Sequence, residues 1–266
     1  MPQMREVKFK HTFSKSLSNL LPLFCIFIIL PIWEVAVRYF EVPNFLLPAP
    51  SVIYQAFIDV DINRWTTHLW ATLRVALLGF GLSILISLPL AVLMVSSKFL
   101  AKTLYPILVI IQSTPVVAIA PLLVVILGAG EAPRLAITCL ITFFPLVVSA
   151  TTGMLSTPDE LIELSKSLKT SAIKEIWHIR LPYAVPHIFS GMKVAISLAI
   201  IGAVVAEFVA AEQGLGYFVQ FSTSYFKIPQ AFAALLLLSA LSLILFKTVQ
   251  LVQYLFFRWS LPKDKY

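Results

Sequence analysis

Long apolar runs alternate with short polar segments along almost the whole chain. A helix needs about 20 apolar residues to cross the hydrocarbon core of a bilayer, and most of these runs are close to that length. Because lipid offers no partner to unpaired backbone groups, a helix is the expected structure of each run. We expect six spans, at roughly 17–39, 71–96, 104–127, 135–154, 191–211 and 230–254. The pattern predicts an all-α, polytopic membrane protein.

The composition agrees with this interpretation. Of the 266 residues, 59% are hydrophobic and 12% are charged, whereas soluble domains average about 25% charged residues. The net charge of +7 comes from Lys and Arg scattered at the ends of the apolar runs, where such residues orient a membrane protein. We therefore assign the positive charge to orientation and contact with the lipid bilayer, and expect no nucleic-acid partner.

The Lys and Arg residues also predict the orientation. With the N-terminus in the cytoplasm, the inner segments carry fifteen of these residues and the outer segments carry five, so both termini are expected to be cytoplasmic. The first run is too long for a signal peptide and is interpreted as a retained span. We divide the chain into an N-terminal part (1–64), a core of five spans (65–254) with a polar loop (157–182), and a C-terminal cytoplasmic tail (255–266).

The polar loop, on the cytoplasmic side between spans four and five, has a strong signal for a helix start. Thr157 is expected to cap the helix, Pro158 suits the first helical position, and Glu160 falls at the capping-box position. The first short helix should run to about Leu168.

A second short helix is expected to follow a bend. Thr170 or Ser171 is expected to cap it, and it should extend through Ile179. Leu181-Pro182 should end it, because the residue before a proline is disfavoured in the helical region.

Apolar residues alternate with charges in this loop. They are Leu161, Ile162, Leu164, Leu168, Ile173, Ile176, Trp177 and Ile179. A short helix outside lipid is expected to bury an apolar face against protein. The alternative is a solvated loop whose charges face water.

The loop also carries a spaced pattern, formed by Glu163, Leu164, Ser165, Lys169, Ile179, Leu181 and Pro182. This pattern resembles the "EAA" loop of permease subunits of ATP-binding-cassette importers: E-A-A, three residues, G, nine residues, I-x-L-P. Glu163 takes the acidic position, although an ordinary helical acid is an equal alternative for it. Lys169 takes the glycine position. Lysine with a positive φ costs on the order of 1 kcal/mol, so either the bend is made differently or an ATPase contact holds it.

The resemblance extends over residues 65–251. It is strongest to the nitrate, sulfonate, taurine and thiamine-precursor branch, through the segments 47–51 (LPAPS), 115–122, 206–208 and 214–217. It implies the type I importer permease fold in the bacterial inner membrane. It also implies a second permease copy, two ATP-binding subunits at the loop, and an external solute-binding protein that delivers a small solute.

The chain lacks the G-x-x-x-x-G-K loop that cradles nucleotide phosphates. We therefore expect it to be a transport subunit that is not itself an enzyme, with no cofactor or metal of its own. ATP and Mg²⁺ are expected on the partner ATPase.

Two groups are candidates for lining the solute pathway. Gln112, Ser113 and Thr114 form a polar patch before Pro115, which is expected to kink the third span and free carbonyls toward a pore. Glu207 lies near the outer end of span five, where an ionisable group faces either a cavity or interfacial water. Few positive charges lie at mid-membrane depth, which favours an organic, partly aromatic or neutral solute.

Two other classes of membrane protein are alternatives. An ion-coupled secondary transporter should show acids near the midplane and an internal repeat. An intramembrane enzyme should show a His, Asp or Glu cluster at membrane depth. The sequence shows neither feature.

Overall fold

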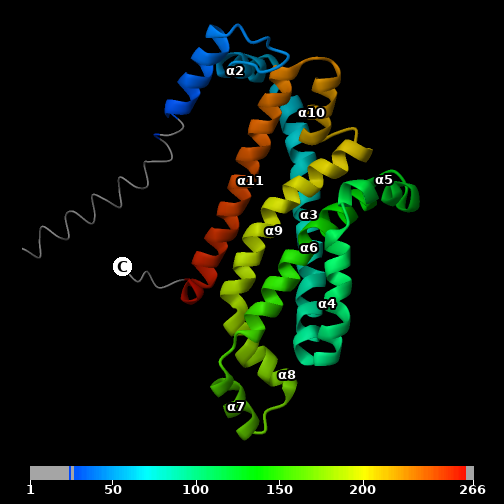
Figure 1. Ribbon diagram of the computed structural model, residues 1–266, viewed down its shortest axis with the longest axis vertical. Helices are drawn as coiled ribbons and strands as arrows, with labels where there is room; N and C mark the ends of the chain where they lie inside the picture. The colour runs from blue at the N-terminus through cyan, green and yellow to red at the C-terminus, as the bar shows by residue number, and fades with distance from the viewer. Residues whose placement is uncertain (1–23, 25–26, 262–266) are drawn as a thin grey trace, which may run out of the picture. The chain divides into compact units, whose positions relative to one another are not determined.

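The structure, a computed structural model, describes Phe24 and residues 27–261, and this part is helical without a strand (Figure 1). The predicted all-α class is confirmed. The helices are the first helix at 27–39, α2 (Pro50–Asp59), α3 (Ile62–Ser96), α4 (Lys98–Ser113), α5 (Val116–Leu127), α6 (Glu131–Leu155), α7 (Asp159–Ser167), α8 (Ala172–Glu175), a π-turn (Ile176–Arg180), α9 (Leu181–Ala210), α10 (Leu215–Ser224), α11 (Ile228–Phe256) and a 3₁₀ turn (Arg258–Ser260).

Four of the described helices are long and apolar enough to cross a membrane. They are Ile62–Ser96, Glu131–Leu155, Ala172–Ala210 and Ile228–Phe256. They correspond to the second, fourth, fifth and sixth predicted spans. The first predicted span, at 17–39, lies largely outside the described residues. The chain is thus a multi-pass membrane protein.

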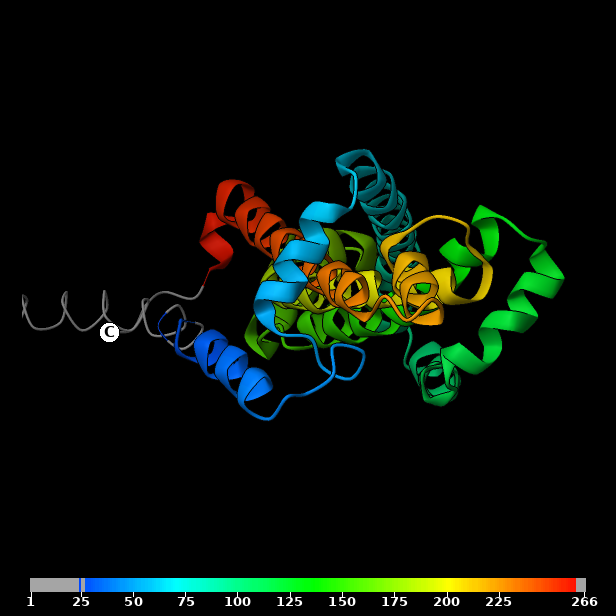
Figure 2. The same ribbon diagram turned by 90° about the horizontal axis from the view of Figure 1, so that it is seen from above.

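The third predicted span is wrong as a single helix, because the chain bends by 94° between α4 and α5. Thr114, which precedes Pro115, has an extended ψ of 126°, as expected for a residue before proline. The hydroxyls of Ser113 and Thr114 donate to carbonyls of the preceding turn, at 2.7 and 3.0 Å. The Ile110 carbonyl is not free, because the Thr114 amide also donates to it at 3.2 Å, so these hydroxyls bond back onto the preceding turn as Ser and Thr commonly do in helices. Both helices lie on one side of their unit (Figure 2), where α4 contacts α3 and α6 and α5 contacts α6 and α9.

The chain falls into two compact units. One comprises residues up to Val60 together with Ser222–Ala233, and the other comprises Asp61–Phe221 together with the chain from Ala234 onward. In the first unit Glu34 accepts hydrogen bonds from Arg38 (2.6 Å) and from the backbone and hydroxyl of Ser51 (3.0 and 2.7 Å). The LPAPS segment is thereby held to the first helix.

In the larger unit, α6 packs against both α3 and α9. Thr138 of α6 is fully buried and faces a glycine on each neighbour. A Cβ on Gly79 of α3 would lie 2.5 Å from the Thr138 Cγ2 atom, and one on Gly202 of α9 would lie 2.9 Å from its Cα atom. Glycine is therefore required at both positions for the backbones to approach this closely.

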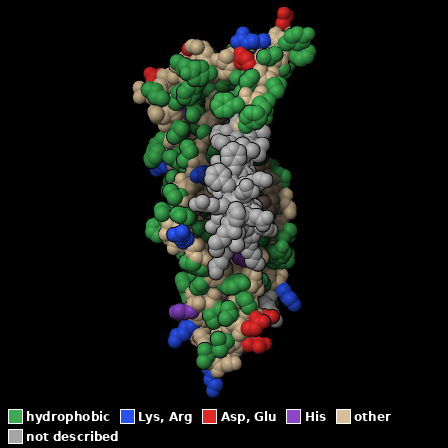
Figure 3. Space-filling model, turned by 90° about the vertical axis from the view of Figure 1, so that its left-hand side faces the viewer, with side chains coloured by type: hydrophobic (Ala, Val, Ile, Leu, Met, Phe, Trp, Pro, Cys, Tyr) green, Lys and Arg blue, Asp and Glu red, His purple; other side chains and the backbone are tan. Residues whose placement is uncertain are grey.

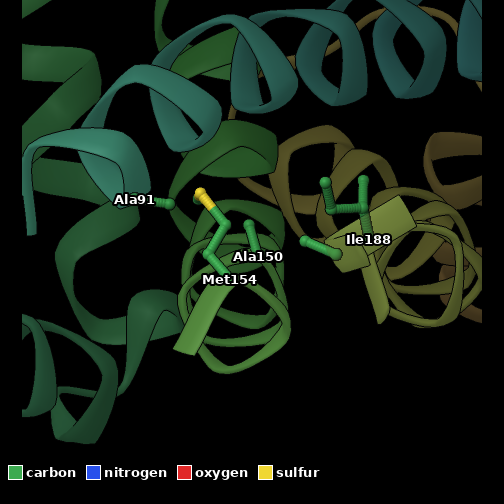
Figure 4. Close-up of a cluster of buried hydrophobic side chains, with 5 residues drawn as sticks. Ala91, Ala150, Met154 and Ile188 are labelled. Carbon is green, nitrogen blue, oxygen red and sulfur yellow. The ribbon is translucent and has the colours of Figure 1, made fainter. Parts of the chain in front are cut away.

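Nearer the loop, an apolar cluster joins the same three helices. Met154 and Ala150 of α6 lie with Ala91 of α3 and Ile188 of α9 (Figure 4). Hydroxyl groups add bonds between α3 and α6, since the Ser87 hydroxyl donates to the Phe143 carbonyl at 3.0 Å. The three helices thus form one closely packed core that carries the polar loop.

Candidate functional site

The polar loop leaves the core at the end of α6 and returns at the start of α9 (Figure 1). The predicted cap by Thr157 is wrong. The Thr157 hydroxyl donates to the Met154 carbonyl of α6 at 2.9 Å, where it satisfies a group that the end of α6 leaves unpaired. Pro158 stands at the N-cap position without a side-chain bond, and α7 begins with Asp159 and Glu160. The acids of this first turn favour the helix through its dipole.

The bend after α7 is built on Lys169, whose φ is +52°. The Thr170 amide donates to the Ser165 carbonyl at 3.0 Å, and the Lys169 amide donates to the Lys166 carbonyl at 2.9 Å. These two bonds form a Schellman motif, which normally places glycine at the left-handed position. The turn expected of a glycine is therefore made here by the lysine itself.

The second loop helix does not end at Leu181-Pro182, contrary to our expectation. Leu181 is helical, with φ −66° and ψ −48°, and its amide bonds the Ile176 carbonyl across the π-turn. In a regular α-helix the ring of Pro182 would clash with the carbonyl four residues earlier. The wider π-turn moves that carbonyl, so helical structure continues from Ala172 to Ala210.

The side chains of the loop differ in how far they are exposed. Ile162, Ser165 and Ile176 are buried, whereas Ile179, Leu181 and Pro182 are half-buried. The exposed group comprises Glu160, Glu163, Leu164, Lys169, Leu161, Leu168, Ile173 and Trp177. Charged and apolar side chains gather at this end of the molecule (bottom of Figure 3).

We define the coupling surface as the five apolar side chains Leu161, Leu164, Leu168, Ile173 and Trp177. Their exposed fractions range from 39% at Leu161 to 71% at Ile173. Exposed apolar side chains among charged neighbours favour an interaction site. These five side chains lie on α7, α8 and the turns that follow these helices.

Sequence reasoning missed Glu175 and Arg180, which flank the π-turn. The Arg180 Nε atom donates to Glu175 Oε1 at 2.8 Å, and the two side chains are only 18% and 15% exposed. Their i,i+5 spacing gave no signal, because residues that contact along an α-helix are three or four apart.

The predicted pathway patch lies at the bend between α4 and α5. Gln112, Ser113, Thr114 and Pro115 are all exposed there. Their role in lining a pathway stays a prediction.

Glu207 is only 1% exposed and lies against the amino end of α10. Its Oε2 atom accepts a hydrogen bond from the Gly216 amide at 2.7 Å. Gly214 has a φ of +127°, and a Cβ there would collide with the Glu207 carboxylate. The carboxylate therefore requires glycine at position 214, and its negative charge suits a helix amino terminus.

Two side chains of α3 bind the same helix end. The Thr72 hydroxyl accepts a hydrogen bond from the Leu215 amide at 2.8 Å, and His68 Nδ1 accepts one from the Gly214 amide at 3.1 Å. The amides of residues 214–216 stand at the start of α10, where no carbonyl of the helix can accept from them. Each of the three donates to a side chain instead. Glu207 and the α3 side chains hold α10 to the core.

The chain belongs to a family of importer membrane subunits. The family described as "Binding-protein-dependent transport system inner membrane component" matches residues 79–260. The chain is therefore a permease subunit of the ATP-binding-cassette importer type. This family relies on ATP-binding subunits and solute-binding proteins as partners. The alternatives of an ion-coupled transporter and an intramembrane enzyme are thereby set aside.

Two relatives and one solved structure support this assignment. The chain is 32% identical to the formylaminopyrimidine transport permease protein ThiX of Halalkalibacterium halodurans, over 92% of this chain and 98% of the relative. It is 28% identical to the taurine transport system permease protein TauC of Escherichia coli, over 80% and 79%. The inward-facing MetNI methionine ABC transporter structure matches with a TM-score of 0.62 at 20% identity, covering 73% of this chain and 94% of that one. The predicted branch and fold are confirmed.

The first prediction concerns the bend at Lys169. Lys169→Gly should stabilise the Schellman motif by about 1 kcal/mol, because glycine adopts a positive φ without a steric cost. Amide exchange of residues 165–170 in the purified permease should become slower. Lys166→Gly, inside α7, is the control and should speed this exchange, since glycine costs about 1 kcal/mol in a helix. Slower amide exchange in both variants would contradict the assignment of a Schellman motif with Lys169 at its left-handed position.

The second prediction concerns Glu207. Glu207→Ala should lower the free energy of unfolding by about 1–3 kcal/mol, because it leaves the buried Gly216 amide unsatisfied. Glu207→Gln keeps an acceptor and should lower it less. Thermal unfolding of the purified permease measures both effects, and exposed Glu212→Ala is the control. If the Ala and Gln variants melt together, the carboxylate does not hold α10 by this bond.

Proposed function

We propose that the coupling surface is the docking site for the importer's ATP-binding subunits. The observation that carries this proposal is the loop between α6 and α9, which exposes five apolar side chains on α7, α8 and the turns that follow them. The excess of Lys and Arg on its side of the membrane supports a cytoplasmic position, with both termini on the same side.

The assembly we propose contains two copies of this permease and two ATP-binding subunits. ATP and Mg²⁺ are bound by those subunits, since this sequence lacks a phosphate-binding Gly-Lys loop. Glu163 and Glu160 stand exposed at the rim of the coupling surface and contribute polar contacts there. ATP changes the preferred state of its own subunit, and that difference shifts the permease between outward and inward access.

The solute is proposed to be a small molecule of the sulfonate, nitrate, taurine or thiamine-pyrimidine-precursor class. The relatives named for formylaminopyrimidine and taurine transport support this range. An external binding protein delivers it. Gln112 to Pro115, exposed at the break between α4 and α5, line part of the pathway. Glu207, the other candidate for this role, is buried against the amino end of α10.

The third prediction tests the docking site. Deletion of 161–174 should abolish co-elution of the permease with its ATP-binding subunits, because it removes four of the five side chains of the coupling surface. Glu163→Ala should weaken co-elution, and Glu212→Ala, an exposed acid beyond the far end of α9, should leave it unchanged. Full association of the deletion variant, with the permease intact by thermal unfolding, would refute the docking site.

The fourth prediction tests the solute class. In proteoliposomes that contain the complete importer and its binding protein, we expect ATP-driven uptake of taurine, an alkanesulfonate, nitrate or an aminopyrimidine. Methionine should be transported poorly and serves as the control. Uptake of methionine alone among these compounds would overturn the proposed class.

A further inference from the structure

The π-turn at Ile176–Arg180 separates the coupling surface from the long span α9. It interrupts what is otherwise continuous helix from Ala172 to Ala210. π-turns are rare, and many of them occur at functional sites. Ile173 and Trp177 of the coupling surface lie just before and within this turn. A movement of Ile173 and Trp177 that is passed along the chain to α9 therefore goes through the π-turn.

An ion pair fixes the geometry of this turn. Glu175 and Arg180 are five residues apart, and the Leu181 amide likewise bonds a carbonyl five residues back, at Ile176. In a regular α-helix, residues five apart point about 140° away from each other. The pair therefore fits the wide turn and would be lost if the turn became regular α-helix.

The same arginine also contacts the core. Its Nη1 atom lies 3.5 Å from the Met154 carbonyl in the last turn of α6, where a cation is favoured by the helix dipole. Met154 is itself fully buried in the cluster that joins α3, α6 and α9 (Figure 4). Arg180 thus joins the π-turn to α6, while its own backbone leads into α9.

Burial makes this pair sensitive to the loss of one partner. Both side chains are more than four-fifths buried, so removing one charge leaves the other desolvated and uncompensated. The exposed side chains of the coupling surface are not part of this pair. A variant at the pair can therefore alter the joint while leaving the docking surface in place.

We propose that Glu175 and Arg180 are positioning residues that stiffen the joint between the coupling surface and the two spans α6 and α9. A stiff joint passes the displacement of α7 and α8 on to both spans, whereas a loose joint absorbs it. The inference rests on the proposed docking of ATP-binding subunits and adds the route by which their movement enters the membrane.

The test uses the complete importer in proteoliposomes and three variants. Arg180→Gln and Glu175→Gln each break the pair, and Arg180→Lys keeps a cation beside both Glu175 and the Met154 carbonyl. We measure co-elution with the ATP-binding subunits, ATP hydrolysis, and solute uptake per ATP hydrolysed. The matched control is Arg74→Gln, which breaks the more exposed Arg74–Glu131 pair of 3.0 Å between α3 and α6.

We expect both glutamine variants to co-elute and to hydrolyse ATP, with uptake per ATP reduced about tenfold, within the usual range of coupling between sites. Arg180→Lys should retain much of this ratio, and the control should leave it unchanged. This result would distinguish the charge of the pair from a general loss of stability, because Arg180→Lys and Arg180→Gln both replace the same largely buried side chain.

Three results would overturn the inference. They are normal uptake per ATP in both glutamine variants, a ratio in Arg180→Lys as low as in Arg180→Gln, and loss of co-elution in the glutamine variants, which would place the pair in docking rather than in transmission. None of these results touches the proposed function. That proposal fails separately, if the wild-type permease does not bind its ATP-binding subunits through the loop.

Discussion

The rest of the larger unit depends on the close approach of α3, α6 and α9 around Thr138. With a glycine of α3 on one side and a glycine of α9 on the other, the backbones lie nearer than any side chain with a Cβ would permit. Membrane helices gain little from hydrophobicity against lipid, so such close packing is the main source of their association. The core formed in this way holds the polar loop at one end of α9 and the first turn of α10 at the other.

Periodicity and length predicted the apolar spans because both follow from the thickness of the bilayer. The prolines were harder to interpret. Pro115 breaks a predicted span, whereas the helix continues through Pro182. The difference lies in the turn before each proline. At Pro182 the π-turn opens the hydrogen-bond ladder and Leu181 stays helical, whereas at Pro115 the preceding residue, Thr114, is extended. The rule on the residue before a proline describes Pro115 and does not anticipate the π-turn at Pro182.

The candidate site was predictable where its interactions are local. The spacing in the loop located the bend at Lys169, because a bend of this type involves only a few neighbouring residues. The roles of Glu207 and Arg180 were not predictable. Glu207 shares the amino end of α10 with Thr72, and Arg180 contacts the carbonyl of Met154. These partners are far away in sequence, and only the packing of the helices brings them together.

Each end of α9 is therefore held by a buried ionisable side chain. At one end a buried arginine fastens the π-turn to α6, and at the other a buried carboxylate fastens α10. Between them α9 is a helix of 30 residues, about 45 Å long at 1.5 Å per residue. A helix packed as closely as this one against α6 transmits displacement with little bending. Any compliance between the coupling surface and α10 must then lie in these two joints, which makes their buried charges the positions where coupling is set.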